Sequence, residues 1–362
     1  MSGSTTIVHI VSRDKFTAGY INFMKLRMTE WEHHFFVAAS GIYEVNPVDE
    51  QNIHYYSGVN DITSGHNLEL LRSCSKIIIS GVGNTRLLLA LRREFTHKTY
   101  LQFWGGDFYD FRYSRHPKNP IRLLKWLVKR YIHHQFIKKC AGTISLISTD
   151  IDALNKIFPS STKHFTARMP WDVLEHHTFD VLASRKHDGS SIRILAGNSA
   201  QRPNEHSGIF QNLAHLKDAD IEILSPLSYG EEDYRDEVIT LGRKIFGGKF
   251  TPIIDFIPKE KYVEFLASCD AAVFNQNQQA ALGNIWLMLR LGRKVYIREN
   301  TSMWQDFKSQ GAVIYPVAEL AGADIASLAD MPEKDRKINM ALTEEYLSGK
   351  QTRKEWETVL ND

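Results

Sequence analysis

The sequence predicts an α/β protein with two domains, each of them a parallel sheet with helices on both faces. Three observations support this prediction. Short apolar runs alternate with segments of helical periodicity along nearly the whole chain, which is the pattern of parallel strands connected by helices. The 362 residues exceed one ordinary domain and suffice for two. A polar stretch near residue 185 interrupts the alternation and is typical of a linker.

The first half of the chain predicts a domain over residues 1–172. Short apolar runs predict its strands, and apolar residues three or four positions apart predict its helices. The expected strands are residues 7–11, 35–39, 53–56, 76–80, 99–103 and 143–147. The expected helices are residues 17–31, 67–72, 85–95 and 121–139. A linker over residues 173–190 follows, because Pro170 and the polar run to Gly189 break the pattern.

The second half predicts another domain over residues 191–330. Its expected strands are residues 192–196, 221–224, 250–254, 271–274, 294–297 and 313–315. Its expected helices are residues 205–216, 233–246, 259–267, 281–291 and 303–310. Two further helices, residues 334–347 and 353–360, fall within residues 331–362 and are expected to pack back toward the N-terminal domain.

Candidate site residues of the first half follow three strands, at the edge of a parallel sheet where functional loops lie. They are Arg13, Asp14, Gly81, Trp104, Gly105, Gly106 and Asp107. Glycines let a ligand approach the backbone, Trp104 offers a surface on which a sugar can stack, and Asp107 or Asp110 can accept a proton or hold hydroxyls. The alternative is a loop with a capping aspartate.

The most informative stretch of the second half is residues 190–213, which read as a strand, a polar loop and a helix that starts near Asn204. The backbone N–H groups at a helix start, with the positive end of the helix dipole, bind anions. Arg202 and His206 add charge and hydrogen bonds, so this stretch predicts a diphosphate site. The alternative is that Asn204 only caps the helix and Arg202 is solvated.

Polar residues and glycines follow four strands of the second half. They are Gly197, Asn198 and Ser199 after the first strand, Tyr229 after the second, Gln278, Gln279, Gly283 and Asn284 after the fourth, and Glu299 and Asn300 after the fifth. Amides both donate and accept hydrogen bonds, which suits the hydroxyls and carbonyls of a sugar nucleotide. Strand ends of one sheet meet at one edge, so these residues are expected to form one crevice.

Residues 111–149 contain no Asp or Glu. Their positive charges are Arg112, Arg115, Lys118, Arg122, Lys125, Lys129, Arg130, Lys138 and Lys139. Aromatic and apolar residues, among them Trp126 and Tyr131, lie between these charges, as in helices that bind anionic lipid surfaces. The alternative is a solvated helix face over a packed core. Nucleic acid is not an expected partner, because the net charge of the chain is only +2.

Other features limit the function classes. Three cysteines far apart argue against disulfides and a zinc cluster, and fit a reducing compartment. No apolar run approaches the ~20 residues that span a bilayer, and no signal peptide is expected. Asp150 and Asp152 read as the first turn of a helix, and adjacent histidines such as His33 and His34 lack ligand spacing. No metal and no cofactor are therefore expected, and the protein is expected to be cytoplasmic or attached to a membrane surface.

Several motifs in order resemble a known family over about residues 7–315. They are 195–199 (Leu-Ala-Gly-Asn-Ser) with Asn204 and His206, 278–283, 298–306 (Arg-Glu-Asn-Thr-Ser-Met-Trp-Gln-Asp) and 104–107 (Trp-Gly-Gly-Asp). Together they are similar to the bacterial TDP-Fuc4NAc:lipid II transferases of enterobacterial common antigen synthesis, which are 4-alpha-L-fucosyltransferase-like. The resemblance implies a GT-B glycosyltransferase, with two Rossmann-like domains facing across a crevice.

The resemblance also implies a reaction. A deoxy-amino hexose would pass from a dTDP-linked donor to a lipid-linked or cell-surface glycan, such as one on polyprenyl diphosphate, at the inner face of the bacterial inner membrane. The second-half motifs would bind the donor, the first-half loops the acceptor, and Asp107 would act as general base. Arg202, His206 and helix dipoles would stabilise the leaving diphosphate without a metal. A sugar-nucleotide epimerase of similar layout and a non-catalytic glycan- or nucleotide-binding module are the alternatives.

Overall fold

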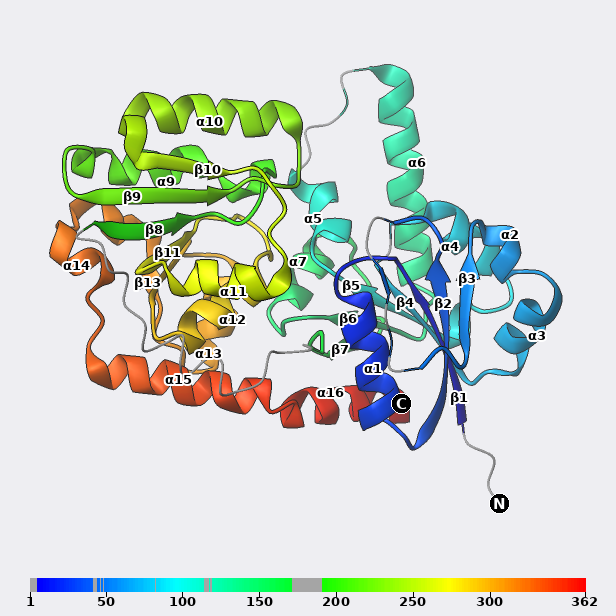
Figure 1. Cartoon of the computed structure of the whole chain (residues 1–362). Coiled ribbons are helices and arrows are strands. Elements are labelled where there is room, and N and C mark those ends of the chain that lie inside the picture. The colour runs from blue at the N-terminus through cyan, green and yellow to red at the C-terminus, as the bar shows by residue number, and fades with distance from the viewer. Residues whose placement is uncertain are drawn as a thin grey trace. The chain divides into compact units, whose positions relative to one another are not determined.

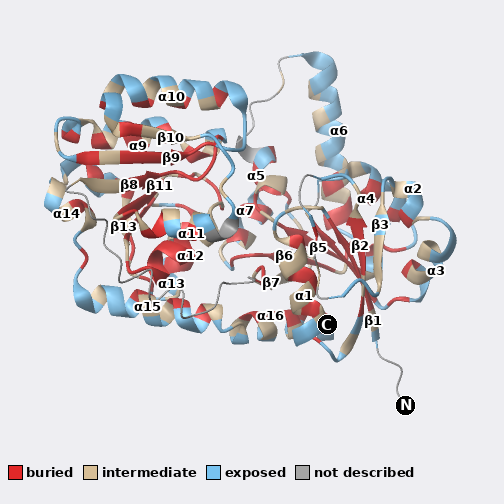
Figure 2. Ribbon diagram, viewed as in Figure 1, coloured by how far each residue is buried: buried red, intermediate tan, exposed pale blue. Residues whose placement is uncertain are grey.

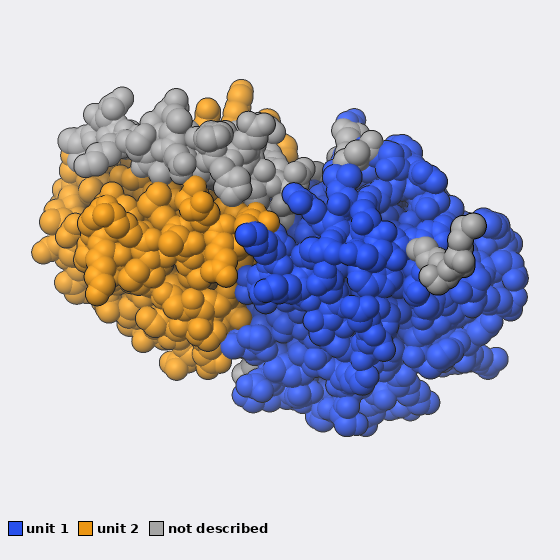
Figure 3. Space-filling view, turned by 90° about the horizontal axis from the view of Figure 1, so that it is seen from below, with its two compact units in different colours: residues 1–172, 349–362 blue, residues 173–348 orange. Residues whose placement is uncertain are grey.

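The computed structural model describes residues 5–41, 44, 45, 47, 49–81, 83–113, 117, 119–170 and 191–362. The predicted linker, residues 173–190, lies outside the described residues. The chain divides into two compact units, which Figure 3 shows in different colours. Unit 1 comprises residues 1–172 and 349–362, and unit 2 comprises residues 173–348.

Unit 1 is built on a parallel sheet of seven strands in the order β3-β2-β1-β4-β5-β6-β7 (Figure 1). The strands are β1 (Thr5–Val11), β2 (Trp31–Ala38), β3 (Ile53–Tyr56), β4 (Lys76–Ser80), β5 (Thr99–Phe103), β6 (Gly142–Ser145) and β7 (His164–Thr166). Ile10 of β1 pairs with Phe36 of β2 and with Ile79 of β4. All three side chains are buried in one cluster, so this face of the central strands is apolar.

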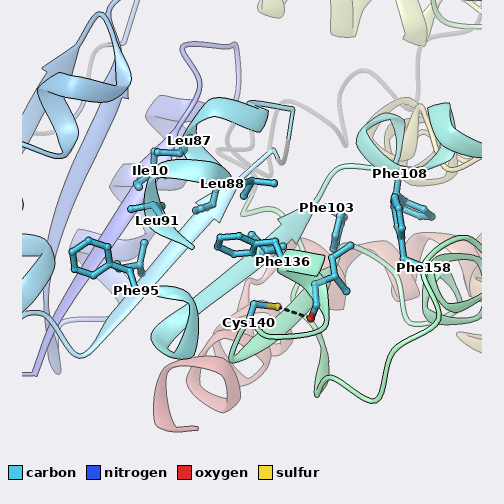
Figure 4. Packing of buried hydrophobic residues seen from close by; sticks show 14 of the residues in the cluster. Ile10, Leu87, Leu88, Leu91, Phe95, Phe103, Phe108, Phe136, Cys140 and Phe158 are labelled. Atoms are coloured by element: carbon cyan, nitrogen blue, oxygen red, sulfur yellow. Dashed lines mark hydrogen bonds between the residues drawn. The ribbon is translucent and has the colours of Figure 1, made fainter. Parts of the chain in front are cut away.

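The helices of unit 1 cover its sheet, and those between residues 59 and 157 do so through the same buried cluster. They are α1 (Thr17–Arg27), α2 (Val59–Ile62), α3 (Gly65–Ser73), α4 (Thr85–Leu91), α5 (Gly106–Tyr113), α6 (Pro120–Ile137), α7 (Asp150–Ile157) and α16 (Lys350–Asn361). Leu87 and Leu91 of α4 meet Phe136 of α6 and Phe103 of β5 in this cluster (Figure 4). The core therefore fixes α6 and the end of β5 relative to each other.

α16 belongs to unit 1 although it follows the whole of unit 2 in the chain. Trp356 is fully buried, stacks edge-on against Tyr20 of α1 at 5.5 Å between ring centroids, and donates its indole N–H to the carbonyl of Arg168 at 3.0 Å. Arg168 also forms a 3.2 Å ion pair with Glu355. The C-terminal helix therefore covers α1 and the end of the sheet of unit 1.

Unit 2 repeats the topology with six parallel strands in the order β10-β9-β8-β11-β12-β13. The strands are β8 (Ile192–Ala196), β9 (Ile221–Pro226), β10 (Phe250–Ile253), β11 (Ala271–Phe274), β12 (Lys294–Ile297) and β13 (Tyr315–Pro316). The helices are α9 (His206–Leu213), α10 (Glu232–Phe246), α11 (Lys259–Ala267), α12 (Leu282–Arg290), α13 (Ser302–Ser309), α14 (Ile325–Ala329) and α15 (Glu333–Leu347). α15 packs on α12 within unit 2, where Tyr346 stacks on Trp286 at 4.1 Å.

The strands and helices expected from the sequence are present, with boundaries within four residues of the prediction. One element was missed in the candidate site. Residues 104–110 were interpreted as a loop, but Gly106 begins α5, and Gly105, with φ of +94°, accepts the first backbone hydrogen bonds of this helix from Phe108 and Tyr109. The glycine pair starts a helix here because Gly105 adopts a left-handed conformation that most residues avoid.

Candidate functional site

Both sheets reverse their strand order between the first and the fourth strand of the unit. The reversal lies between β1 and β4 in unit 1 and between β8 and β11 in unit 2. In doubly wound sheets, ligands bind at the carboxyl ends of the strands beside this reversal. The candidate ligand-binding loops are therefore those that follow β1, β4 and β5 in unit 1 and those that follow β8, β9 and β11 in unit 2.

In unit 2, Asn198 and Asn204 form the centre of a buried hydrogen-bond network. The backbone N–H of Asn198 donates to Oδ1 of Asn204 at 3.0 Å, and the Asn204 amide nitrogen donates to Oγ of Ser199 at 3.0 Å. The amide nitrogen of Gln276, in the loop after β11, donates to both Asn198 Oδ1 and Asn204 Oδ1 at 3.0 Å. Asn204 thus holds the β8 loop together instead of capping α9, whose N-cap residue is Glu205.

The loop after β9 joins the same network. Ala200 and Gly230 form a bridge, in which Ala200 N–H donates to the carbonyl of Tyr229 and accepts at its own carbonyl from Glu231 N–H, both at 2.8 Å. The Asn198 amide nitrogen donates to the Tyr229 hydroxyl at 3.1 Å. The structure thus brings the predicted residues Gly197, Asn198, Ser199, Asn204 and Tyr229 together from two strand ends.

His206 is the first residue of α9 and is fully buried. Burial lowers the pKa of its imidazole to about 4, so the ring is neutral at physiological pH. The Tyr234 hydroxyl lies 3.2 Å from both the backbone nitrogen and Nδ1 of His206. The expectation that His206 supplies positive charge to a diphosphate is therefore corrected: a neutral ring offers hydrogen bonds only.

Arg202 lies apart from this network, at the exposed surface. Its guanidinium forms ion pairs with Glu231 at 3.2 Å, Asp233 at 2.8 Å and Glu237 at 3.1 Å. Its carbon Cζ also lies 5.0 Å from the centre of the Tyr234 ring. Three carboxylates thus neutralise the charge that the sequence reasoning assigned to a diphosphate, and a ligand would have to compete with them.

The predicted amides lie in the loop after β11 and at the start of α12. Gln278 and Gln279 are buried, and the side-chain oxygen of each lacks a hydrogen-bond partner among the described residues. Asn284, in the first turn of α12, donates to the Tyr262 hydroxyl at 2.8 Å. Gly283 precedes it in that turn, and the N-cap residue Ala281 has φ of +57°.

Glu299 and Asn300 follow β12, as predicted. Asn300 is exposed and has φ of +57°, which turns the chain toward α13. The Glu299 carboxylate is half-buried and makes no hydrogen bond or ion pair with any of the residues that the structure describes. Among the described residues, no hydrogen bond joins Glu299 to the Asn198–Asn204 network.

In unit 1, Trp104 connects three strand ends. Its indole N–H donates to Oγ of Ser80, the last residue of β4, at 2.8 Å. Its ring lies 5.4 Å from the ring of Phe16, which follows β1. The Asp107 carboxylate accepts a hydrogen bond from the Trp104 backbone N–H at 3.1 Å and is half-buried. The predicted acceptor residues Trp104 to Asp107 thus lie at one edge of the sheet.

The other predicted residues of unit 1 have local structural roles. The Asp14 carboxylate accepts from Ser12 Oγ at 2.6 Å and from the backbone N–H of Phe16 at 2.8 Å, which shapes the start of α1. Arg13 donates to the carbonyl of Ala39 at 3.2 Å. Gly81 has φ of +80°, and a β-carbon at Gly81 or at Gly106 would meet no atom within 4 Å.

The central part of the basic stretch lies in α6, and residues 120–131 of this helix form an exposed face (Figure 2). Apolar side chains on this face are 48% to 66% exposed, and they are Ile121, Leu124, Leu127, Val128 and Tyr131. Basic side chains beside them are Arg122, Lys125 and Lys129. Trp126 and Phe136, by contrast, pack against the core of unit 1. Arg112, Arg115 and Lys118 lie where the structure describes no side chains.

The described part of the chain has neither a metal-binding cluster nor a helix that could span a membrane. Among residues 5–170 and 191–362, apart from the short gaps named above, no group of three or more His, Cys, Asp or Glu side chains is arranged to hold a metal ion. Within the same residues, no helix is both long enough and apolar enough to cross a membrane.

Sequence reasoning missed Gln276 and Phe16. Gln276 stands in an amide-rich run, residues 275–279, in which nothing in the sequence distinguishes the anchored amide from its neighbours. Phe16 follows the predicted Arg13 and Asp14, and only the fold brings it to Trp104. The apolar character of Phe16 beside a polar loop was the one signal that pointed to a packing partner.

Comparison with known proteins places this geometry in a family. A model of the 4-alpha-L-fucosyltransferase glycosyl transferase group 56 family matches residues 5–355. Similar solved structures are sucrose-phosphate synthase from Thermosynechococcus elongatus (TM-score 0.71, 10% identity, 99% of this chain and 98% of that chain) and a Rickettsia africae glycosyltransferase (0.64, 11%, 99% and 98%). Anabaena HepE, in complex with UDP and glucose, is another (0.67, 9%, 99% and 99%).

These structural likenesses show the fold, which is the GT-B glycosyltransferase fold. The family match covers nearly the whole chain and bears on activity, because it is a match to a transferase family rather than to epimerases or binding modules. The chain belongs to the 4-alpha-L-fucosyltransferase glycosyl transferase group 56 family, and it is a Leloir glycosyltransferase.

Proposed function

We propose that this glycosyltransferase moves a deoxy-amino hexose from a dTDP-linked donor to a glycan carried on polyprenyl diphosphate. The observation that carries the proposal is the hydrogen-bond network of three buried amides, Asn198, Asn204 and Gln276, with the hydroxyl of the exposed Tyr229. It joins three strand ends beside the strand-order reversal of unit 2. Buried amides with defined partners give a rigid polar surface, which suits a ligand rich in hydroxyls and carbonyls.

The donor binds to unit 2 in this proposal. The diphosphate lies at the helix starts of α9 and α12, where backbone N–H groups and the helix dipoles favour negative charge. Gly283, in the first turn of α12, lets the phosphates approach the backbone, and Gly197 allows the turn that places the start of α9 beside β8. Glu299, whose carboxylate has no partner among the described residues, accepts hydrogen bonds from a ribose or sugar hydroxyl.

The acceptor binds to unit 1, with Asp107 as general base. The carboxylate takes a proton from the acceptor hydroxyl, whose oxygen then attacks the anomeric carbon as the bond to the leaving diphosphate breaks. Both oxygens of the Asp107 carboxylate accept from the Trp104 backbone N–H, at 3.1 Å and 3.2 Å, which holds the carboxylate in place. Trp104 provides a ring face for the acceptor sugar.

We further propose that α6 attaches the enzyme to the cytoplasmic face of the bacterial inner membrane, where a polyprenyl-linked acceptor is found. Ile121, Leu124, Val128 and Tyr131 occur every three or four residues and thus form one exposed apolar stripe. Lysine and arginine side chains flank the stripe, and residues 111–149 contain no acidic residue to oppose them. This combination favours insertion at an anionic lipid interface.

Calorimetric titration with dTDP, UDP and GDP, each with and without EDTA, tests the donor proposal. We expect dTDP to bind most tightly and with the same affinity when EDTA is present. Preference for UDP or GDP would overturn the dTDP assignment. The absence of binding to all three nucleotides, in a protein whose unfolding is cooperative, would contradict a donor site in unit 2.

A further inference from the structure

Gln276 is the most completely buried amide of the β11 loop. Its side chain is 0% exposed, and it stands two residues beyond the end of β11, the central strand at the strand-order reversal of unit 2. Both hydrogens of its amide nitrogen are used, because Nε2 donates to Asn198 Oδ1 and to Asn204 Oδ1, each at 3.0 Å. Gln276 is therefore anchored from one end.

The orientation of this amide follows from its partners. The backbone N–H of Asn198 is an obligate donor, so the atom of Asn204 that it contacts must be the oxygen Oδ1. The other end of Asn204 contacts the carbonyl of Gln201 at 3.2 Å, which is an obligate acceptor and requires the amide nitrogen. Asn204 therefore presents an oxygen to Gln276, and Gln276 must present its nitrogen to Asn204.

The oxygen at the other end of the Gln276 amide is therefore a buried hydrogen-bond acceptor. Oε1 of Gln276 has no hydrogen-bond partner among the described residues. A buried polar atom without a hydrogen-bond partner destabilises the folded protein, so a partner supplied by a ligand is favourable. The neighbouring side-chain oxygens of Asn277, Gln278 and Gln279 share this state. Four consecutive residues thus present oxygens that lack a donor.

The chemistry of these oxygens limits the ligand group that they can contact. Phosphate oxygens are acceptors, so the diphosphate is excluded from this position. A thymidine moiety offers only its 3′ hydroxyl and one ring N–H as donors, at opposite ends of the nucleoside. A hexose offers several O–H or N–H groups on one ring. We propose that Gln276 Oε1 accepts a hydrogen bond from an O–H or N–H group of the transferred sugar, as a specificity-determining residue.

This inference rests on the proposed function, since it requires a sugar-nucleotide donor in unit 2. Comparison of two ligands, dTDP and dTDP-glucose, distinguishes binding of the sugar from binding of the nucleotide. Dissociation constants of both are measured by calorimetry for the wild type, for Gln276→Met, and for Gln310→Met as a control that loses an amide elsewhere in unit 2. The informative quantity is the ratio of the two constants, because damage to the nucleotide site alters both alike and cancels.

We expect Gln276→Met to weaken dTDP-glucose relative to dTDP by about tenfold, the value of one hydrogen bond lost to a buried group. The control variant should keep the wild-type ratio. An unchanged ratio in Gln276→Met, with wild-type binding intact, overturns the inference alone. Absence of binding of both dTDP and dTDP-glucose to the wild type overturns the proposed function and the inference with it.

A measurement on the wild type covers the case in which Gln276→Met does not fold. Analogues of dTDP-glucose in which one hydroxyl at a time is replaced by fluorine keep the size of the group but cannot donate a hydrogen bond. We expect at least one analogue to bind about tenfold more weakly than dTDP-glucose. Equal affinity for every analogue would mean that no sugar hydroxyl donates to the loop, and would overturn the inference.

Discussion

Gly197 and His206 lie in direct contact: a β-carbon on Gly197 would come within 2.5 Å of the His206 atom Nε2. Gly197 also has φ of +72°, a conformation that side-chain-bearing residues rarely adopt. The glycine is therefore required twice at this position, once for the turn after β8 and once for the close approach of α9. This contact sets how near the start of α9 lies to the strand end.

Substitution of Gly197 by alanine should destabilise unit 2 more than the backbone conformation alone explains. We expect Gly197→Ala to lower the free energy of unfolding by about 2–4 kcal/mol, from the left-handed conformation and the overpacking together. Gly311→Ala is the matched control, because Gly311 has φ of +86° but open space around its β-carbon position. Hydrogen exchange in β8 and α9 measures the loss, and equal effects of both variants would contradict the contact.

Asp107→Asn tests the general base without removing the contact to Trp104, because the asparagine oxygen can still accept from the backbone N–H. Loss of the base should reduce the rate of sugar transfer by about a hundredfold to ten-thousandfold. Binding of dTDP should be unchanged, because the donor residues lie in unit 2. Initial rates at saturating donor, beside calorimetric titration, separate the two effects.

Asp110→Asn is the control for this prediction, since Asp110 lies on the same helix, α5, and is exposed. Its rate should stay near that of the wild type. A large loss of rate in the Asp110 variant, with Asp107→Asn nearly as active as wild type, would assign the base to Asp110 and contradict the proposed role of Asp107.

Reversal of the charge of two basic residues in α6 should release the protein from anionic membranes. We expect the pair Arg122→Glu and Lys125→Glu to weaken binding to vesicles of phosphatidylglycerol and phosphatidylethanolamine by about tenfold or more, since each basic side chain near the surface contributes about 1 kcal/mol. The pair Arg92→Glu and Arg93→Glu changes the net charge equally at exposed positions outside α6. Cosedimentation that drops equally for both pairs would indicate a general charge effect and contradict docking through α6.

The apolar stripe gives an independent test of the same surface. Leu124 is 62% exposed, so Leu124→Ser should cost unit 1 little stability. It should nevertheless weaken vesicle binding, and more visibly at high salt, where the electrostatic contribution is screened. Binding that is abolished by salt and indifferent to Leu124→Ser would show that α6 stays outside the apolar part of the bilayer.

Local pattern predicted the fold well, because each element is determined by short-range periodicity. The run 271–274 is apolar throughout and forms β11, buried on both sides. The same reasoning placed polar residues at strand ends, since side chains that cannot join an apolar core collect where the strands stop. It failed at α5, where two glycines are typical of a loop, but Gly106 begins a helix directly after the left-handed Gly105.

Relations across long sequence separations could not be predicted. The acids that neutralise Arg202 lie 29 to 35 residues later in the chain. Gln276 is anchored by Asn198 and Asn204, which precede it by 78 and 72 residues. In α6, Trp126 packs inward while the adjacent Leu127 is 49% exposed, and only the packing of α6 on unit 1 decides between them.

A chain of buried groups in unit 1 carries the last prediction. His33 Nε2 lies 2.9 Å from the carbonyl of Met28, so this nitrogen must donate. His33 Nδ1 then accepts from His9 Nε2 at 2.9 Å, and His9 Nδ1 accepts from the Tyr20 hydroxyl at 2.8 Å. Both imidazoles are neutral in this arrangement, and a further proton on either ring would break the chain.

Unit 1 should therefore lose stability in mild acid. Burial lowers the pKa of His33 to about 4, whereas the unfolded chain has a histidine pKa of about 6.5. Between these values the unfolded state binds more protons than the folded state. The free energy of unfolding is therefore constant above about pH 6.5 and falls as the pH drops toward 4. Its slope is up to about 1.4 kcal/mol per pH unit for each such group.

His33→Gln should show a shallower slope in β1 and β2 than the wild type when hydrogen exchange is followed from pH 7 to pH 5. His97→Gln, at an exposed position, should keep the wild-type slope. If His33→Gln keeps it as well, then His33 does not remain neutral in the folded protein.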